Sequence, residues 1–177
     1  MSKRLTIAQN LLREILSYDP DTGIFRWKVD RSTRCRIGDV AGGYDAEGYV
    51  CIAINRTTYK AHRLAWMYVY GFMPKYLDHV NRNPADNRIA NLRECSHSQN
   101  CMNKGQRTDN TSGFKGVHWD KESRKWRVYI EIGEKRIHIG RFDSINNAAR
   151  AYNIAVIKYF GEFAELNDVP SLFSGVV

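Results

Sequence analysis

One stretch of the sequence, residues 77–103, gathers side chains that could perform metal-assisted chemistry. It contains the adjacent pair Asp78 and His79, a loop rich in asparagine, and Asn100 further along. A carboxylate and an amide oxygen are hard ligands, suited to Mg²⁺, Mn²⁺ or Ca²⁺, and two protein ligands leave room for water and phosphate oxygens. A neutral histidine beside them can accept a proton from water. The combination predicts a phosphodiester hydrolase with His79 as general base and one divalent metal ion at Asp78 and Asn100.

Local sequence signals place these side chains on two short strands, a loop and a helix. Residues 76–80 and 89–94 are predicted strands, and the Asn, Asp and Pro residues between them favour turns. Ser96 and Gln99 have the spacing of a capping box, so a helix that carries Asn100 should begin there. Neighbouring residues on a regular strand point to opposite faces, so Asp78 and His79 can share a site only where the strand twists or ends.

The same segment resembles the ββα-metal motif of HNH endonucleases, especially the phage and intron homing enzymes. His79, Asn91 and Asn100 fall on the three signature positions, with asparagine in place of the final histidine. The resemblance implies double-stranded DNA as substrate, Asp78 and Asn100 as ligands of Mg²⁺ or Mn²⁺, and His79 as the base. It also implies that Asn91 belongs to the catalytic set as the residue that braces the loop. An Asp-His pair alone would mean nothing, whereas the pair, the loop DNRIANLR and the capped helix together are specific.

The residues before this motif predict a small antiparallel sheet with two helices. An amphipathic helix is expected at residues 6–17, strands at 24–29, 49–54 and 58–60, and an aromatic-rich helix at 61–71. This pattern also resembles the sheet that precedes the HNH motif in phage endonucleases. His62, in the second helix, is interpreted as a structural residue.

A different pattern follows a polar linker at residues 104–111. Three strands are predicted at 114–119, 125–132 and 135–142, and then a helix capped by Ser144 that runs to residue 160. One face of this sheet is apolar and the other is basic and aromatic. Residues 104–160 hold 12 Lys and Arg against 6 Asp and Glu, a net charge of +6. A cationic sheet face is able to read a major groove, although exposed strand positions are polar in any protein.

The segments SGFKGVHW, KWRVYIEI and RIHIGRFDS resemble the APETALA/ethylene-response-factor DNA-binding domain. The resemblance implies that the outer sheet face binds DNA through six positions: Lys115, His118, Arg127, Tyr129, Arg136 and His138. The first strand holds fewer arginines than the plant pattern, and His138 stands where that pattern has tryptophan. DNA binding is therefore implied, but the plant target sequence is not.

We therefore predict an α+β protein built around a ββα-metal HNH module. A small antiparallel sheet with helices precedes this module, and a three-stranded antiparallel sheet packed on one helix follows it. The nuclease domain would cover residues 1–103 with its core motif at 76–103, the docking domain 112–167, and a tail 168–177. The whole chain carries 27 Lys and Arg against 19 Asp and Glu, which agrees with a polyanionic partner.

The apolar runs are shorter than the ~20 residues needed to span a bilayer, and no signal peptide is recognised. The four cysteines lack CxxC spacing and are interpreted as reduced thiols. We expect a monomer in the cytoplasm of the cell, the host cell if the gene is carried by a phage. Two alternatives remain open: a transcriptional regulator whose HNH half is only structural, and a restriction-type nuclease that is not a homing enzyme.

Overall fold

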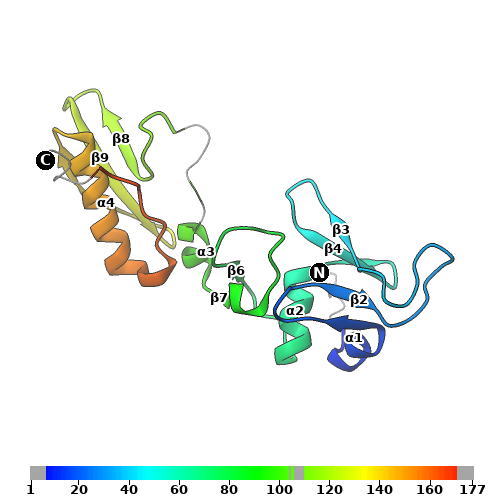
Figure 1. The fold of residues 1–177 in the computed structure, drawn as a ribbon. Coiled ribbons are helices and arrows are strands. Elements are labelled where there is room, and N and C mark those ends of the chain that lie inside the picture. The colour runs from blue at the N-terminus through cyan, green and yellow to red at the C-terminus, as the bar shows by residue number, and fades with distance from the viewer. Residues whose placement is uncertain (1–6, 104, 106–109, 171–177) are drawn as a thin grey trace, which may run out of the picture. The chain divides into compact units, whose positions relative to one another are not determined.

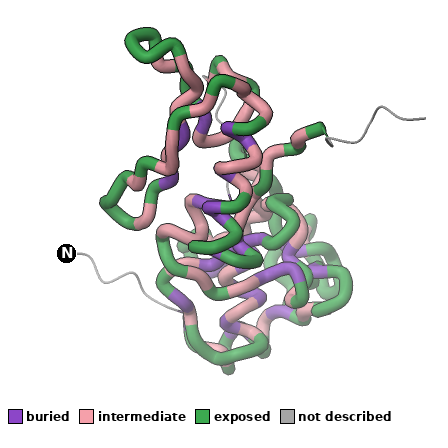
Figure 2. Tube along the Cα trace, turned by 90° about the vertical axis from the view of Figure 1, so that its left-hand side faces the viewer, coloured by how far each residue is buried: buried purple, intermediate pink, exposed green. Residues whose placement is uncertain are grey.

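The computed structural model describes residues 7–103, 105 and 110–170. The chain divides into two compact units, residues 1–95 and 96–177. Each unit combines helices with small antiparallel sheets (Figure 1), which confirms the predicted α+β class. Figure 2 shows short buried segments within the body of the fold and exposed segments at the loop tips.

The first unit begins with α1 (Gln9–Ile15), which runs directly into β1 (Leu16–Tyr18). The prediction of a helix to residue 17 is therefore wrong at its end, and residue 6, where the helix was predicted to begin, lies outside the described residues. Leu16 is fully buried opposite Trp27 because β1 pairs with β2 (Phe25–Trp27). Pairing with a distant strand has overridden the local helical pattern.

A three-stranded sheet and a helix complete the scaffold of the first unit. The sheet has the order β3 (Gly43–Tyr44), β4 (Val50–Ile54), β5 (Thr57–Lys60). Asn55 and Arg56 both have positive φ angles, as a two-residue hairpin turn requires. α2 (Ala61–Tyr70) follows β5 without a break and ends at Gly71, whose φ is 81°. The shared core includes Leu12, Leu16, Phe25, Ile52 and Leu64.

The motif that carries Asp78 and His79 follows α2. β6 (Leu77–His79) pairs with β7 (Leu92–Glu94), and a single 3₁₀ turn, η1 (Ile89–Asn91), precedes β7. α3 (His97–Asn103) comes next. Its predicted capping box is confirmed: the Ser96 N–H donates to Gln99 Oε1 at 2.7 Å, and the Gln99 N–H donates to Ser96 Oγ at 3.2 Å. The division at residues 95 and 96 assigns α3 to the second unit, whereas we predicted a nuclease domain that ends at residue 103.

The second unit is a three-stranded antiparallel sheet covered on one face by a helix. The sheet has the order β10 (Lys135–Phe142), β9 (Lys125–Ile132), β8 (Val117–Asp120). α4 (Ile145–Phe160) packs on it through Ala148 and Ala149, which are fully buried, and the 3₁₀ turn η2 (Gly161–Phe163) follows. Ser144 is the N-cap residue of α4 as predicted, but its side chain makes no capping hydrogen bond.

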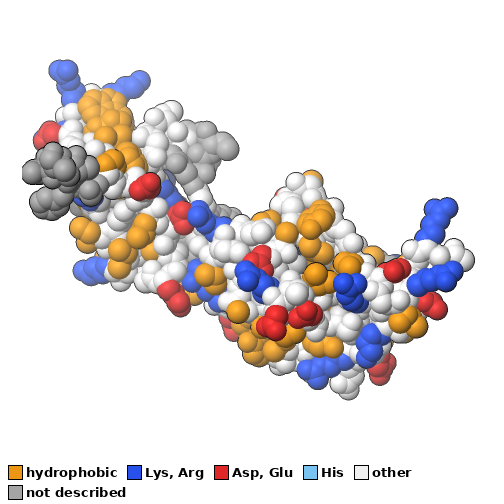
Figure 3. Space-filling view, in the orientation of Figure 1, with side chains coloured by type: hydrophobic (Ala, Val, Ile, Leu, Met, Phe, Trp, Pro, Cys, Tyr) orange, Lys and Arg blue, Asp and Glu red, His pale blue; other side chains and the backbone are white. Residues whose placement is uncertain are grey.

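The described residues also settle the state of the cysteines, the question of a membrane-spanning helix, and the position of one group of exposed arginines. The four cysteines are free thiols. Within the described ranges, no helix is both long and apolar enough to cross a membrane. Figure 3 shows Lys and Arg side chains extending from the loop between β2 and β3, where Arg31, Arg34 and Arg36 are exposed.

Candidate active site and nucleic-acid interface

The β6–β7 hairpin places Asp78 and His79 on opposite faces. Asp78 lies across from Arg93 and His79 across from Leu92. β6 ends at His79, where the chain turns away: the Val80 N–H donates to the Asn91 carbonyl at 2.9 Å and the Arg82 N–H to the His79 carbonyl at 3.0 Å. β6 therefore ends at His79, which meets the condition under which Asp78 and His79 can contribute to one site.

Asp78 is a buried carboxylate with a cationic partner. Its side chain is 6% exposed, and Oδ2 lies 3.0 Å from Arg93 Nη2 and 3.1 Å from Nε. A buried charge is costly unless it is paired and hydrogen-bonded, and the two-atom contact with Arg93 satisfies that condition. Arg93 thus holds the Asp78 carboxylate in one orientation through two contacts with Oδ2.

Asn91 ties together the loop between the two strands. Its Oδ1 accepts from the Asn81 N–H at 3.0 Å, and its Nδ2 donates to Asn81 Oδ1 at 3.0 Å and to the Asp86 carbonyl at 2.8 Å. The side chain is 7% exposed, so these bonds form away from bulk water. The three hydrogen bonds connect Asn91 to Asn81 and Asp86, at two separate points of the loop.

His79 is buried among neutral polar and aromatic groups. Its Nε2 lies 3.4 Å from Asn87 Oδ1, and its ring contacts the rings of His62 and Tyr49 at centroid distances of 4.9 and 6.0 Å. Burial lowers the pKa of His79 below its ordinary value, while the hydrogen bond to Asn87 and the charges of Asp78 and Asp86 act in the opposite direction. The neutral imidazole, which can accept a proton, is therefore the form present near neutral pH.

Asn100 lies in α3, within the second unit. The helix is anchored there at both ends: Ser98 Oγ accepts from the Gly133 N–H at 2.9 Å, and Lys115 Nζ donates to the Met102 carbonyl. Met102 and Asn103 are buried, whereas Asn100 is half-buried. A seven-residue helix is marginal by itself, so these contacts fix α3 and with it Asn100.

The donor atoms suit a hard metal ion. Within the described part of the chain, no group of three or more His, Cys, Asp or Glu side chains could hold a metal ion. Asp78 and Asn100 offer oxygen ligands, the type that Mg²⁺ and Mn²⁺ take together with water and phosphate. Asp78 belongs to the first unit and Asn100 to the second, so each is an oxygen donor of its own unit.

The register of the second sheet gathers the predicted docking residues on the face opposite α4. His118 lies across from Arg127, Tyr129 across from His138, and Glu131 across from Arg136, while the buried Val117 and Val128 point to the helix. Lys115 precedes β8 and completes the predicted set.

The irregularity between His138 and Gly140 brings Arg141 opposite Arg127, onto the same outer face. Asp120 Oδ2 lies 3.3 Å from Arg141 Nε and 3.8 Å from Arg127 Nη1. The simple alternation used in the sequence analysis could not find Arg141, because one irregular residue reverses the alternation beyond it.

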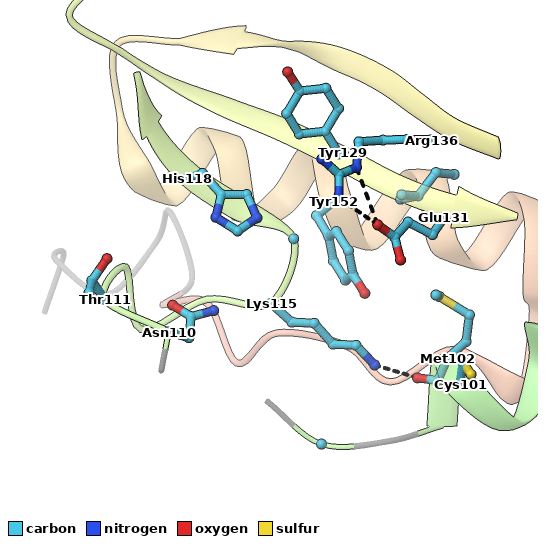
Figure 4. A pocket seen from close by; sticks show the side chains of 13 residues that line it. Cys101, Met102, Asn110, Thr111, Lys115, His118, Tyr129, Glu131, Arg136 and Tyr152 are labelled. Carbon is cyan, nitrogen blue, oxygen red and sulfur yellow. Dashed lines mark hydrogen bonds and ion pairs between the residues drawn. The ribbon is translucent and has the colours of Figure 1, made fainter. Parts of the chain in front are cut away.

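A basic and aromatic pocket of about 580 Å³ opens at this surface (Figure 4). Tyr129 is contacted by two guanidinium groups, with Arg127 Cζ 4.9 Å and Arg136 Cζ 5.5 Å from its ring centroid. Burial, followed by the charges of Arg136 and Arg127, lowers the pKa of His118. The pocket wall also contains Lys115 and Glu131, and Glu131 holds Arg136 by an ion pair of 2.8 Å. Such a surface can contact phosphates and stack on bases.

Comparison with known proteins connects the first site to a family. The family described as HNH endonuclease matches residues 59–102, the range that contains α2, the β6–β7 hairpin and most of α3. The chain is 39% identical over 99 residues to Protein 3.8 of Escherichia phage T7, a match that covers 53% of this chain and 82% of the phage protein. It is 30% identical over 111 residues to the uncharacterized HNH endonuclease L560 of Acanthamoeba polyphaga mimivirus, covering 61% of this chain and 57% of that protein.

The chain belongs to the HNH endonuclease family.

This HNH endonuclease also carries an AP2-like region. It is 34% identical over 59 residues to the AP2-like ethylene-responsive transcription factor TOE2 of Arabidopsis thaliana, which covers 33% of this chain and 12% of the plant protein. The chain thus spans only a small part of the plant relative. The family match and the HNH-named relative support a nuclease, as predicted. HNH nucleases in general depend on a metal ion.

The structure adds side chains to the site of this HNH endonuclease that sequence reasoning missed. Asn87 contacts the nitrogen of His79, His62 contacts its ring, and Arg93 pairs with Asp78. Asn87 and Arg93 lie inside the predicted motif, so their sequence positions could have identified them as residues of the site. His62 lies 17 residues before His79, and only the packing of α2 against β6 reveals their contact.

Proposed function

We propose that this HNH endonuclease hydrolyses phosphodiester bonds in double-stranded DNA as a homing-type enzyme, in a reaction that requires one divalent metal ion, Mg²⁺ or Mn²⁺. The observation that carries the proposal is the buried, neutral His79 at the end of β6, next to the ion-paired carboxylate of Asp78. A base and an oxygen ligand on adjacent residues are the minimum that metal-assisted hydrolysis needs.

His79 takes the proton of the attacking water. Asn87 Nδ2 donates to the Ala85 carbonyl at 3.2 Å, so Asn87 Oδ1 faces His79 Nε2 as an acceptor. This contact is a hydrogen bond when the His79 proton is on Nε2, and in that tautomer we propose Nδ1 as the nitrogen that takes the proton from water. The water oxygen forms a bond to phosphorus, the bond from phosphorus to the 3′-oxygen breaks, and the products are a 5′-phosphate and, after protonation from solvent, a 3′-hydroxyl.

Asp78 and Asn100 are the residues proposed to hold the metal ion. When bound, the ion supplies positive charge to the phosphorane-like transition state and to the departing 3′-oxygen. Arg93 orients Asp78 through its contact with Oδ2. Asn91 keeps the loop between the strands in place, so that Asn87 stays beside His79.

The second unit is proposed to dock on DNA through its outer sheet face. The support is the common orientation of five predicted residues and of Arg141: His118, Arg127, Tyr129, Arg136 and His138. Lys115, also predicted for this purpose, lines the adjoining pocket, where its amine donates to the Met102 carbonyl. Phosphate contacts by Arg and Lys would supply affinity and register, and contacts to base edges would supply site preference. We expect a monomer, because a single chain would carry both the nuclease site and the DNA-docking face.

Conversion of supercoiled plasmid to nicked or linear DNA tests the proposal. We expect cleavage with Mg²⁺ or Mn²⁺, none with EDTA, and ends that DNA ligase can rejoin. A map of the cut positions separates a homing enzyme, which prefers few sites, from a restriction-type or degradative nuclease. Equal cleavage with and without EDTA would remove the metal from the account.

A further inference from the structure

His62 forms an aromatic cluster with the proposed base. It is the second residue of α2, and its ring meets that of His79 at a centroid distance of 4.9 Å and an interplanar angle of 72°. The Tyr49 ring lies 5.4 Å from the His62 ring and 6.0 Å from the His79 ring. Each ring of the cluster therefore contacts the other two, and His79 is held at its ring as well as at its nitrogen.

The surroundings of the cluster are ordered by the turn before β4. Asp45 Oδ1 accepts from the Tyr49 N–H at 2.8 Å, and Asp45 Oδ2 accepts from Lys60 Nζ. Lys60 Nζ lies 4.0 Å from the centroid of the Tyr49 ring. Tyr49 is thus fixed from its backbone and from one ring face, so it can act as a rigid support for the two histidines.

The imidazole of His62 is less favourable for the stability of the fold than an apolar ring would be at this position. The residue is 8% exposed, and its Nδ1 makes no hydrogen bond among the described residues. A buried polar atom without a partner costs about 1–3 kcal/mol, whereas a phenyl ring would fill similar space without that cost. Stability alone therefore does not account for His62.

The hydrogen bond to Asn87 does not fix the His79 ring by itself. Its length of 3.4 Å exceeds the usual 2.7–3.2 Å of an N–H···O bond, so it restrains rotation only weakly. Rotation of the ring would carry Nδ1 away from the attacking water. An edge-to-face contact with a second ring resists this rotation, because aromatic pairs prefer a narrow set of relative orientations.

We propose that His62 is a positioning residue for His79: its ring holds the imidazole of His79 in the orientation required for proton transfer. This inference rests on the proposed function, in which His79 is the base. His62 does not need to touch DNA, water or metal for this purpose. Burial, together with the charges of His79, Arg63 and Lys60, lowers the pKa of His62 to about 3, so the contact joins two neutral rings at working pH.

Two variants of His62 separate its ring from its nitrogen atoms. His62→Ala removes the ring, and we expect the single-turnover cleavage rate at saturating DNA to fall roughly 10–100-fold, the usual effect of losing an orienting partner. His62→Phe keeps a ring of similar size, and we expect it to retain the rate to within about fivefold. DNA affinity should remain unchanged in both variants.

Nuclear magnetic resonance of the histidine rings provides a readout independent of cleavage. The His79 signals, assigned by their loss in His79→Ala, should change or broaden in His62→Ala and keep the wild-type pattern in His62→Phe. Unchanged His79 signals in a folded His62→Ala variant would overturn the inference. So would equally slow cleavage by both variants, because a nitrogen of His62 would then be required. If His79→Ala itself cleaves at the wild-type rate, the proposed function fails, whatever the ring signals show.

Discussion

Replacement of Asn91 by alanine should destabilise the first unit by an amount that follows from its contacts. The Asn91 side chain makes three hydrogen bonds, two to Asn81 and one to the Asp86 carbonyl, from a site that is 7% exposed. At a net value of about 1 kcal/mol each, their loss lowers the free energy of unfolding by roughly 3 kcal/mol. In a unit of this size that corresponds to a drop in Tm of roughly 10–20 °C.

Differential scanning calorimetry of the full chain measures this drop. Asn10→Ala is a matched control, because Asn10 is exposed in α1 and the same substitution there should change stability by less than about 0.5 kcal/mol. Gly116→Ala assigns the transition of the second unit, since a Cβ at Gly116 would lie 2.2 Å from the Tyr152 ring. If Asn91→Ala and Asn10→Ala melt within about 2 °C of each other, Asn91 does not brace the loop.

The remaining predictions concern charge and pH. Burial lowers the pKa values of His62 and His79, so the unfolded chain binds more protons than the folded chain below about pH 6.5, and acidification should decrease stability. For His62, whose pKa falls to about 3, the contribution approaches a slope of about 1.4 kcal/mol per pH unit, and His62→Phe should remove it in denaturant titrations between about pH 4 and 6. Arg127→Ala and Arg136→Ala should each flatten the dependence of log affinity on log salt by nearly one unit, as measured by fluorescence anisotropy with labelled duplex DNA. An unchanged slope in both arginine variants would exclude phosphate contacts there.

Elements with a strong local pattern could be predicted from the sequence. The bounds of β9 and β10 agree with the prediction because apolar and polar residues alternate along β9 and along β10 as far as Ile139. The capping box at Ser96 and Gln99 formed as predicted because it depends on residues three apart. The exchange of helix for strand at Leu16 could not be predicted, since it depends on pairing with β2.

The same distinction applies to the candidate site. The positions of Asp78, His79 and Asn91 on the hairpin and loop follow from a contiguous motif, and the structure gives Asn91 the expected hydrogen bonds. The contact of His62 with His79 arises from tertiary packing, so periodicity contains no signal for it. Arg141 was missed for a third reason, because one irregular position in β10 changes which residues face outward.

The most direct test of the central claim is the single-turnover cleavage rate of His79→Ala on duplex DNA, measured with Mg²⁺ at saturating protein. Loss of a general base should decrease the rate by about 10²–10⁴-fold. The dissociation constant for the same DNA should stay within about twofold of wild type, because His79 is buried and is needed only to activate water. A variant that binds equally well and cleaves at more than a few per cent of the wild-type rate would contradict the assignment of His79 as the base.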